Sequence, residues 1–213
     1  MEEKVHLAHN EVIRNIAFFG DSESPETDPI YKEAYDIAKM LAKKGFTIVN
    51  GGGPGIMNAS TQGAESVGGA TLSVTFYPEN APGFEGKYLR NITDKEIRTD
   101  NYIERMFKLM EHGDLFIIFR GGSGTMSEFA TAWVLAKLYY GHHKPFILFG
   151  EFWHEIIGAI KKGMDINQVE LDVFRIVETK DQILPTIREL QSELMKVDHD
   201  GDCQVCAERA FMT

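Results

Sequence analysis

Residues 121–128 have the composition of a phosphate-binding loop that leads into a helix. They read Gly-Gly-Ser-Gly-Thr-Met-Ser-Glu and follow the apolar run 115–119 almost directly. A strand that ends in glycines lets the backbone approach an anion closely, and the N–H groups at the start of the next helix can hold that anion. The Glu128 carboxylate would then lie beside the group that carries the phosphate. We expect the phosphate contacts to come from Gly121, Gly122, Ser123, Gly124 and Thr125.

A second glycine cluster, at 51–55, follows the apolar run 46–49 and precedes another helical pattern. Ligands of open parallel sheets bind beyond the carboxyl ends of the strands, where the connections diverge. We therefore expect the two glycine loops to face each other across one site, with Gly52, Gly53 and Gly55 near the ligand. The alternative is a tight strand-to-helix turn, although a turn does not require three consecutive glycines.

Thr125 and Glu128 also have an interpretation that involves no ligand. Their spacing is that of a capping box, in which the threonine caps a helix and the glutamate reaches back to the amide of the cap. The glycines that precede them favour the phosphate-binding interpretation, because a capping box does not require glycine.

The elements that must position these residues alternate between strand and helix. The pattern predicts an α/β fold with a doubly wound (Rossmann-like), mostly parallel sheet and helices on both faces, in a single domain. The expected strands are 16–20, 46–50, 71–76, 96–98, 115–119, 145–149 and 174–177. The expected helices are 28–44, 56–66, 101–111, 125–140, 152–162 and 181–196.

Two of these helices bear on function and assembly. Helix 101–111 has an apolar face that leaves Arg105 off its centre, and a lone arginine on such a helix is usually solvated. Helix 125–140 is apolar nearly all round, which is typical of a helix that is central or lies at a subunit interface. Trp133 and Met126 fit packing in either place.

Length and charge limit the organisation and the partners. The chain has 213 residues without an internal linker, so we expect an N-terminal extension at 1–14, one nucleotide-binding domain at 15–197 and an acidic tail at 198–213. The net charge of -10 argues against a nucleic-acid partner. No apolar run approaches the roughly 20 residues that cross a bilayer, and the start is not a signal peptide. We expect a cytoplasmic protein with no membrane partner.

Both cysteines, Cys203 and Cys206, lie in the expected tail beside His199. A structural zinc site needs about four ligands, and one subunit offers fewer there. We favour free thiols in an acidic tail over a zinc or redox site, and we predict no metal and no cofactor.

With both glycine motifs in hand, the chain resembles the LONELY GUY family of phosphoribohydrolases, formerly called lysine-decarboxylase-like, over roughly 16–190. Two motifs carry the resemblance: Gly-Gly-Gly-Pro-Gly-Ile-Met at 51–57, and Gly-Gly-Ser-Gly-Thr-Met-Ser-Glu at 121–128. Weaker matches are Phe19-Gly20 at the end of the first strand, Pro78-Glu79 after the third, and Arg105 before Asp114.

The resemblance implies hydrolysis of the N-glycosidic bond of a nucleoside 5′-monophosphate, with an AMP-like or cytokinin-type substrate. It implies that Arg105 and Glu128 are the catalytic pair and that the protein is a homodimer. A carboxylate suits this reaction because bond cleavage builds positive charge on the sugar. The resemblance adds four residues to the expected binding site: Gly20, Asp21, Glu79 and Arg120. Their alternatives are a turn cap for Asp21, plain loop charge for Glu79 and an ion pair for Arg120.

The chain departs from the family pattern at several positions, among them Asp21, Met106 and Arg120. Asp21 stands where serine is usual, Met106 where lysine is usual, and Arg120 where the second motif usually begins with proline. These departures favour an alternative function, a non-catalytic nucleotide or molybdenum-cofactor carrier of the same fold. A pyridoxal-dependent decarboxylase is the least favoured function, because no lysine has the surroundings of a Schiff-base residue.

Overall fold

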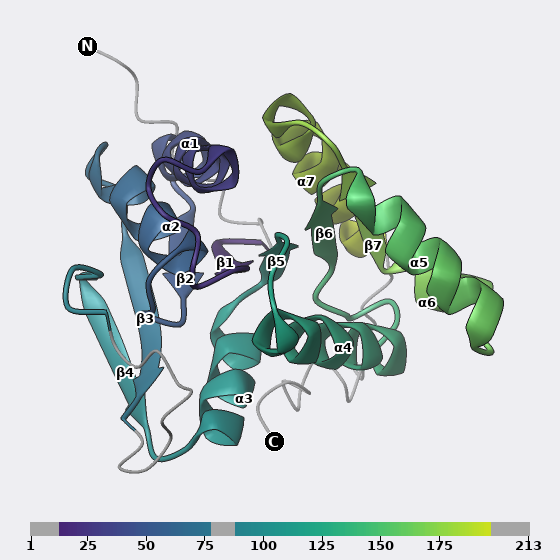
Figure 1. Ribbon diagram of the computed structural model, residues 1–213. Coiled ribbons are helices and arrows are strands. Elements are labelled where there is room, and N and C mark those ends of the chain that lie inside the picture. Colours follow the sequence, from purple (N-terminus) through teal and green to yellow (C-terminus); the bar gives the residue numbers. More distant parts are fainter. Residues whose placement is uncertain (1–12, 78–87, 197–213) are drawn as a thin grey trace, which may run out of the picture.

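The sheet of the protein is fully parallel. The computed structural model describes residues 13–77 and 88–196. Seven strands pair in the order β4-β3-β2-β1-β5-β6-β7, and every pair is parallel (Figure 1). The strands are β1 (Asn15–Phe19), β2 (Thr47–Asn50), β3 (Thr71–Phe76), β4 (Lys95–Thr99), β5 (Leu115–Ile118), β6 (Phe146–Phe149) and β7 (Phe174–Val177). The predicted α/β class and doubly wound sheet are confirmed.

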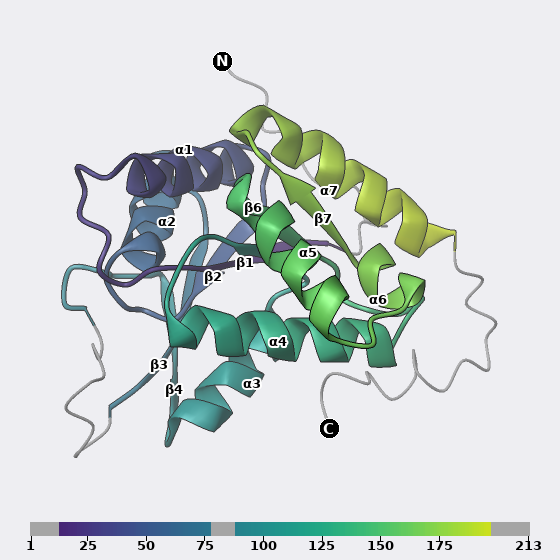
Figure 2. The ribbon, with the colours of Figure 1, turned by 45° about the vertical axis from the view of Figure 1, so that its right-hand side comes forward.

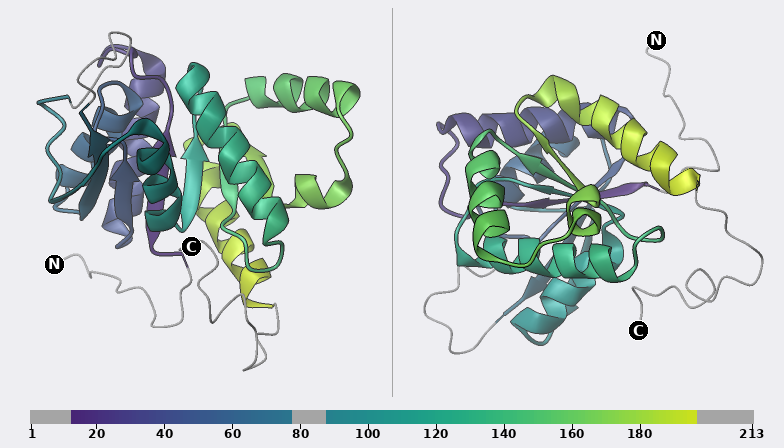
Figure 3. Two further views of the ribbon diagram at one scale, coloured as in Figure 1. Left: turned by 90° about the horizontal axis from the view of Figure 1, so that it is seen from below. Right: turned by 90° about the vertical axis from the view of Figure 1, so that its right-hand side faces the viewer.

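Helices cover both faces of this sheet. They are α1 (Pro29–Lys43), α2 (Ile56–Glu65), α3 (Tyr102–His112), α4 (Ser123–Leu138), α5 (Phe152–Gly163), α6 (Gln168–Asp172) and α7 (Lys180–Met195). Helices α1, α2 and α7 lie on one face, and α3, α4, α5 and α6 lie on the other (Figures 2 and 3). The sequence did not predict α6, because its five residues are too few to show a helical period.

The central strand β1 shows why the sheet is buried on both faces. Ile16 and Phe18 belong to the core beneath α1, α2 and α7, whereas Ala17 and Phe19 belong to the core beneath α3, α4 and α5. Successive strand side chains point to opposite faces, so a strand covered on both sides is apolar throughout. This accounts for the unbroken apolar run in the sequence.

The connections diverge between β1 and β5, which pair directly with Phe18 opposite Ile117. The chain leaves β1 toward α1 on one face, and it leaves β5 toward α4 on the other. Such a switch point leaves a crevice beyond the carboxyl ends of the two strands. The loops that follow β1 and β5 therefore border the expected position of a ligand.

Helix α3 is rotated relative to the prediction. Arg105 is buried beside Met106 and Met110, whereas Ile103 and Phe107, expected on the buried face, are exposed. The alternative interpretation of Arg105 as a solvated surface charge is therefore wrong. The hydrophobic pattern predicted the wrong buried face of α3. It could not show that the Val74 and Gly51 carbonyl oxygens accept hydrogen bonds from the buried guanidinium.

Two features are absent from the described residues, a membrane-spanning helix and a cluster of metal ligands. Within residues 13–77 and 88–196, no helix is both long enough and apolar enough to span a bilayer. In the same ranges, no three His, Cys, Asp or Glu side chains are grouped so that they could hold a metal ion. The expected tail cysteines and Glu79 lie outside the described residues.

Candidate active site

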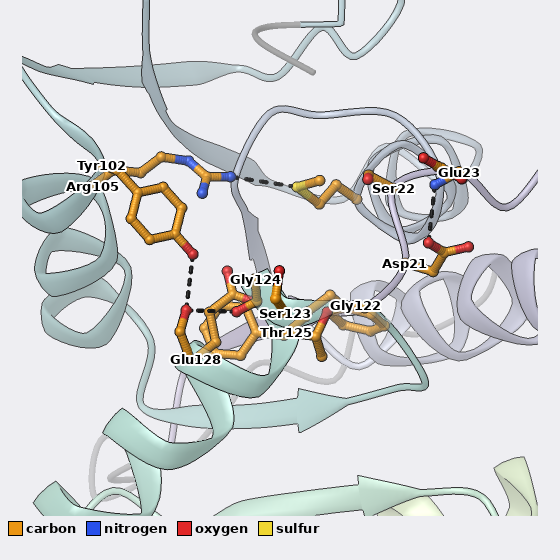
Figure 4. Close-up of a pocket in the computed structure, with 15 residues that line it drawn as sticks. Asp21, Ser22, Glu23, Tyr102, Arg105, Gly122, Ser123, Gly124, Thr125 and Glu128 are labelled. Carbon is orange, nitrogen blue, oxygen red and sulfur yellow. Dashed lines mark hydrogen bonds between the residues drawn. The ribbon is translucent and has the colours of Figure 1, made fainter. Parts of the chain in front are cut away.

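A cavity of about 560 Å³ lies at the switch point (Figure 4). Its lining comes from β1 and the loop that follows it, from Met57 at the start of α2, and from the facing parts of α3 and α4. Tyr102 and Arg105 of α3 lie on one side, and the start of α4 and Glu128 border the cavity below them in this view. Most of these residues are polar or glycine, so the cavity offers many hydrogen-bonding groups to a ligand.

Helix α4 begins two residues earlier than predicted. Its first residue is Ser123 and its N-cap is Gly122, so Thr125 lies inside the first turn. The capping-box interpretation of Thr125 and Glu128 is therefore wrong. The N-cap residue is a glycine, so it supplies no side-chain cap to the start of α4. The first N–H groups of a helix have no partner inside it, so the N-terminus of α4 has the character of an anion site.

The glycines at this N-terminus have two different roles. A Cβ atom on Gly121 would overlap with the Thr125 hydroxyl, so glycine is needed there for packing. By contrast, a Cβ atom on Gly122 would meet nothing within 4 Å, and one on Gly124 would meet only the Tyr102 hydroxyl, at 3.6 Å. Both residues line the cavity. Glycine at these two positions leaves open space for a ligand to reach the backbone.

Glu128 lies one turn into α4 and lines the cavity, with 8% of its surface exposed. The sequence predicted this placement from the loop and the helix that follows it. A carboxylate that is nearly buried yet borders a cavity can act on a ligand with little competition from bulk water. Glu128 is therefore the strongest candidate for a catalytic group.

Arg105 is held in the cavity wall by one backbone carbonyl of β3 and by that of the residue after β2. Its Nε donates to the carbonyl oxygen of Val74 at 3.1 Å, and its Nη2 donates to that of Gly51 at 3.0 Å. Nη2 also lies 3.6 Å from the Met57 sulfur. Only 4% of the arginine is exposed, and the side chain borders the cavity. Arg105 and Glu128 thus line the same site, from α3 and α4 respectively.

The first glycine loop contributes none of its glycines to this cavity, although the sequence predicted that the two glycine loops face each other across one site. Gly52, Gly53 and Gly55 do not line the cavity. The Gly52 N–H donates to the Asn50 side chain at 2.8 Å, and the Gly53 carbonyl accepts from the Asn91 side chain at 2.8 Å. Because β1 lies between β2 and β5 in the sheet, the loop after β1 is the one that lies opposite α4.

The loop after β1 contributes Gly20, Asp21, Ser22 and Glu23 to the cavity. The Asp21 carboxylate accepts from the Glu23 N–H at 3.2 Å and from the Ser24 hydroxyl at 2.7 Å. Asp21 therefore caps its own turn and also borders the cavity. A Cβ atom on Gly20 would lie 2.8 Å from the Ile56 side chain, so close packing against α2 accounts for this glycine.

Two other predicted residues are placed away from the cavity lining. Arg120 is exposed, and neither it nor Gly121 lines the cavity. The Arg120 carbonyl accepts from the Asp21 N–H at 2.9 Å, which joins the two loops of the switch point. A role of these residues in ligand binding remains a prediction.

Sequence reasoning did not select Met57, Tyr102 and Ser127 as site residues, although all three line the cavity. The Tyr102 and Ser127 hydroxyl oxygens are 2.9 Å apart. Their positions offered a signal, because Tyr102 precedes Arg105 by three residues and Ser127 follows Gly124 by three. Residues three or four apart on a helix share a face.

The chain is similar to a known family over most of its length. The model of the SLOG cluster4 family matches residues 13–173. A Mycobacterium tuberculosis protein named cytokinin riboside 5′-monophosphate phosphoribohydrolase is 31% identical over 137 residues, which cover 62% of this chain and 68% of that protein. A rice protein named probable cytokinin riboside 5′-monophosphate phosphoribohydrolase is 27% identical over 186 residues, covering 85% of this chain and 82% of the other. The resemblance found from the motifs is confirmed.

Solved structures share the fold at lower sequence identity. The molybdenum cofactor binding protein of Rippkaea orientalis is 21% identical with a TM-score of 0.62, and the match covers 84% of this chain and 97% of the other. The DNA processing protein A of Helicobacter pylori is 19% identical with a TM-score of 0.54, covering 83% and 80% of the two chains. At these identities the likeness concerns the fold alone.

Proposed function

The chain belongs to the SLOG cluster4 family, and from this premise we propose that it hydrolyses the N-glycosidic bond of a nucleoside 5′-monophosphate. The products would be the free base and ribose 5-phosphate. The observation that carries the proposal is the placement of the nearly buried Glu128 in the same cavity as the uncapped start of α4. The names of the curated relatives support the same reaction.

The start of α4 would bind the 5′-phosphate. Gly122, Ser123 and Gly124 line the cavity at the positive end of the helix dipole, where an anion is stabilised. Binding of this remote group would align the sugar with the reacting groups, which is how phosphate affinity contributes to rate.

Glu128 would act on the sugar and on the attacking water. As the bond from C1′ to the base nitrogen breaks, its electrons go to the base and positive charge develops on the sugar ring. The carboxylate would stabilise this charge and orient a water molecule toward C1′. The water oxygen then bonds to C1′, and one of its protons ends on the departing base.

Arg105 would bind sugar or phosphate oxygens and keep Glu128 oriented. A guanidinium is permanently charged, and two of its nitrogens are already held by backbone carbonyls of Val74 and Gly51. A cation fixed in this way needs little reorganisation when charge changes during the reaction.

AMP is the substrate with which to test the proposal, and AMP nucleotides with a modified N6 group form the second set. Purified protein should release adenine and ribose 5-phosphate from AMP, measured by product chromatography. Glu128→Gln should lower kcat by at least about 10²-fold, in the range typical of a lost acid–base or charge-stabilising group. Glu155→Gln, at an exposed position of α5, is the matched control. Intact nucleotides after prolonged incubation with folded protein would contradict the proposal.

We further propose a homodimer. Helices α3 and α4 present exposed apolar side chains on the face away from the sheet: Ile103, Phe107, Met126, Val134 and Leu138. Exposed apolar side chains of this number on adjacent helices are typical of subunit interfaces. Sedimentation velocity would give the assembly state directly.

A second candidate is a carrier that binds a phosphorylated ligand without turnover. Met106 in place of the usual lysine and the fold shared with a molybdenum cofactor binding protein favour it. Tight binding of AMP or of a copurified cofactor, with no product formed, would decide for the carrier. The net charge of -10 favours a small ligand over nucleic acid in both cases.

A further inference from the structure

The Tyr102 side chain borders the cavity with its ring and its hydroxyl both held in place. Its ring contacts Phe76 edge to face, with 6.1 Å between centroids and an interplanar angle of 73°. Its hydroxyl oxygen lies 2.9 Å from that of Ser127 on α4. This contact joins α3 to α4 beside Arg105 and Glu128 (Figure 4). A phenol fixed at both ends presents its oxygen to the cavity in a defined orientation.

The direction of this hydrogen bond follows from counting protons. The Ser127 hydroxyl donates to the Gly124 carbonyl oxygen at 2.7 Å, and a carbonyl can only accept. Because a serine hydroxyl has one proton, Ser127 can only accept from Tyr102. The phenol proton is therefore engaged, and the Tyr102 oxygen offers lone pairs to a ligand.

The same oxygen borders the open space above the first turn of α4. A Cβ atom built on Gly124 would lie 3.6 Å from the Tyr102 oxygen and within 4 Å of no other atom. Gly124 precedes Glu128 by four residues in α4 and shares a helix face with it, so this space adjoins Glu128 in the cavity. Above the pH of its second ionisation, a phosphate group has no proton to donate, so it cannot form a hydrogen bond to the Tyr102 lone pairs. A hydroxyl group has a proton to donate and can form this hydrogen bond.

We infer that Tyr102 is a substrate-contact residue whose oxygen accepts a hydrogen bond from a ring hydroxyl of the sugar, and that it makes the site selective for ribonucleotides. The inference rests on the proposed function, since a sugar that joins a phosphate at the start of α4 to a reacting carbon at Glu128 passes this point. The 2′- and 3′-hydroxyls are the donors that such a sugar carries. A site built around a hydroxyl rejects the analogue that lacks it.

The test compares AMP, 2′-deoxy-AMP and 3′-deoxy-AMP on wild-type protein and on Tyr102→Phe. Wild type should prefer AMP to at least one deoxy analogue by about 10-fold in kcat/KM, the ratio expected for one hydrogen bond. In Tyr102→Phe, kcat/KM for AMP should fall by about the same factor. The rate with that deoxy analogue should stay unchanged, so the preference disappears. The analogue that shows this behaviour identifies the hydroxyl.

Two further variants separate the contact from a structural effect. Ser127→Ala releases the phenol proton but keeps the phenol oxygen, so the preference for AMP should fall less than in Tyr102→Phe. Tyr35→Phe, the same change on the distant helix α1, should alter neither rate nor preference. Equal slowing of all three nucleotides by Tyr102→Phe, or an unchanged preference, would overturn the inference.

Binding titrations keep the inference distinct from the proposed function. If wild type binds AMP without hydrolysing it, the proposed function fails, and the inference is tested by affinity. AMP should then bind about 10-fold more tightly than the selected deoxy analogue, and Tyr102→Phe should abolish the difference. Equal affinities in wild type would overturn the inference, and failure to bind any of the nucleotides would overturn both.

Discussion

The Arg105 guanidinium lies against the Gly51 backbone, in the space that a side chain at position 51 would need. The Arg105 Nη2 atom donates to the Gly51 carbonyl at 3.0 Å, and a Cβ atom on Gly51 would overlap with the same nitrogen. The first glycine motif therefore bears on the cavity indirectly. It allows a guanidinium to lie against the backbone at the end of β2, and Arg105 then borders the cavity.

Substitution of Gly51 by alanine should displace Arg105. The guanidinium must move because the new methyl group takes its place, and overpacking of this kind costs roughly 1–3 kcal/mol of unfolding free energy. A displacement of about 1 Å at a reacting site can cost on the order of 10²-fold in rate. Urea unfolding and kcat with AMP measure the two effects.

Gly158→Ala is the matched control for this change. A Cβ atom at Gly158, inside α5, would meet nothing within 4 Å. This variant should gain about 0.5–1 kcal/mol from helix propensity and keep its kcat. A folded Gly51→Ala protein with wild-type kcat would show that Arg105 need not occupy the observed position.

Gly122→Ala should weaken nucleotide binding without destabilising the protein. The backbone at Gly122 has a φ of -90°, which alanine adopts without strain, and the new methyl group would meet no protein atom. It would stand in the proposed phosphate site, so KM for AMP should rise by about 10-fold or more, measured by initial rates. Gly163→Ala, also in open space, should leave KM unchanged. Equal KM values for both variants would remove Gly122 from the binding site.

Phe107→Glu should dissociate the proposed dimer. Phe107 lies on the exposed face of α3 with 53% of its surface accessible. A carboxylate buried there in an interface would lose its hydration without a partner. Sedimentation velocity should show a monomer. Met195→Glu on α7, at the same 53% exposure, should sediment as wild type does. A wild-type protein that is already monomeric would refute the dimer.

His143→Asn should make stability less dependent on pH in the acid range. Burial, with smaller contributions from Arg175 and His142, lowers the pKa of His143 to about 4 from an ordinary value of 6.5. Between these values the unfolded chain binds a proton that the folded chain does not, so stability falls as pH decreases from 6.5 to 4. The loss attributable to His143 is on the order of 2 kcal/mol after allowance for its partial exposure.

Asparagine is the informative replacement because its side-chain oxygen can accept from the Gly141 N–H, as His143 Nδ1 does at 3.2 Å. The variant should lose less stability than wild type between pH 7 and pH 4 in urea titrations. His154→Asn, at an exposed position on α5, controls for the substitution itself. Parallel stability profiles for wild type and His143→Asn would contradict the assignment.

The sequence by itself determined the elements and the character of the site. Periodicity, caps and glycine stops depend on residues within a few positions, so the helix predicted at 28–44 matches α1 (Pro29–Lys43) to within one residue at each end. The glycines at 121–124 and the carboxylate one turn later were also readable, because a strand, a loop and a helix start are contiguous in the chain. The parallel sheet followed from the alternation of these elements.

Only the tertiary structure decided which loops face each other and which side chains are buried. Strand order places β1 between β2 and β5, so residues 20–23 rather than 51–55 lie opposite α4. The burial of Arg105 depends on carbonyls of Val74 and Gly51, 31 and 54 positions away in the chain. Contacts at such separations are set by packing across the sheet, and no local pattern of residue types records them.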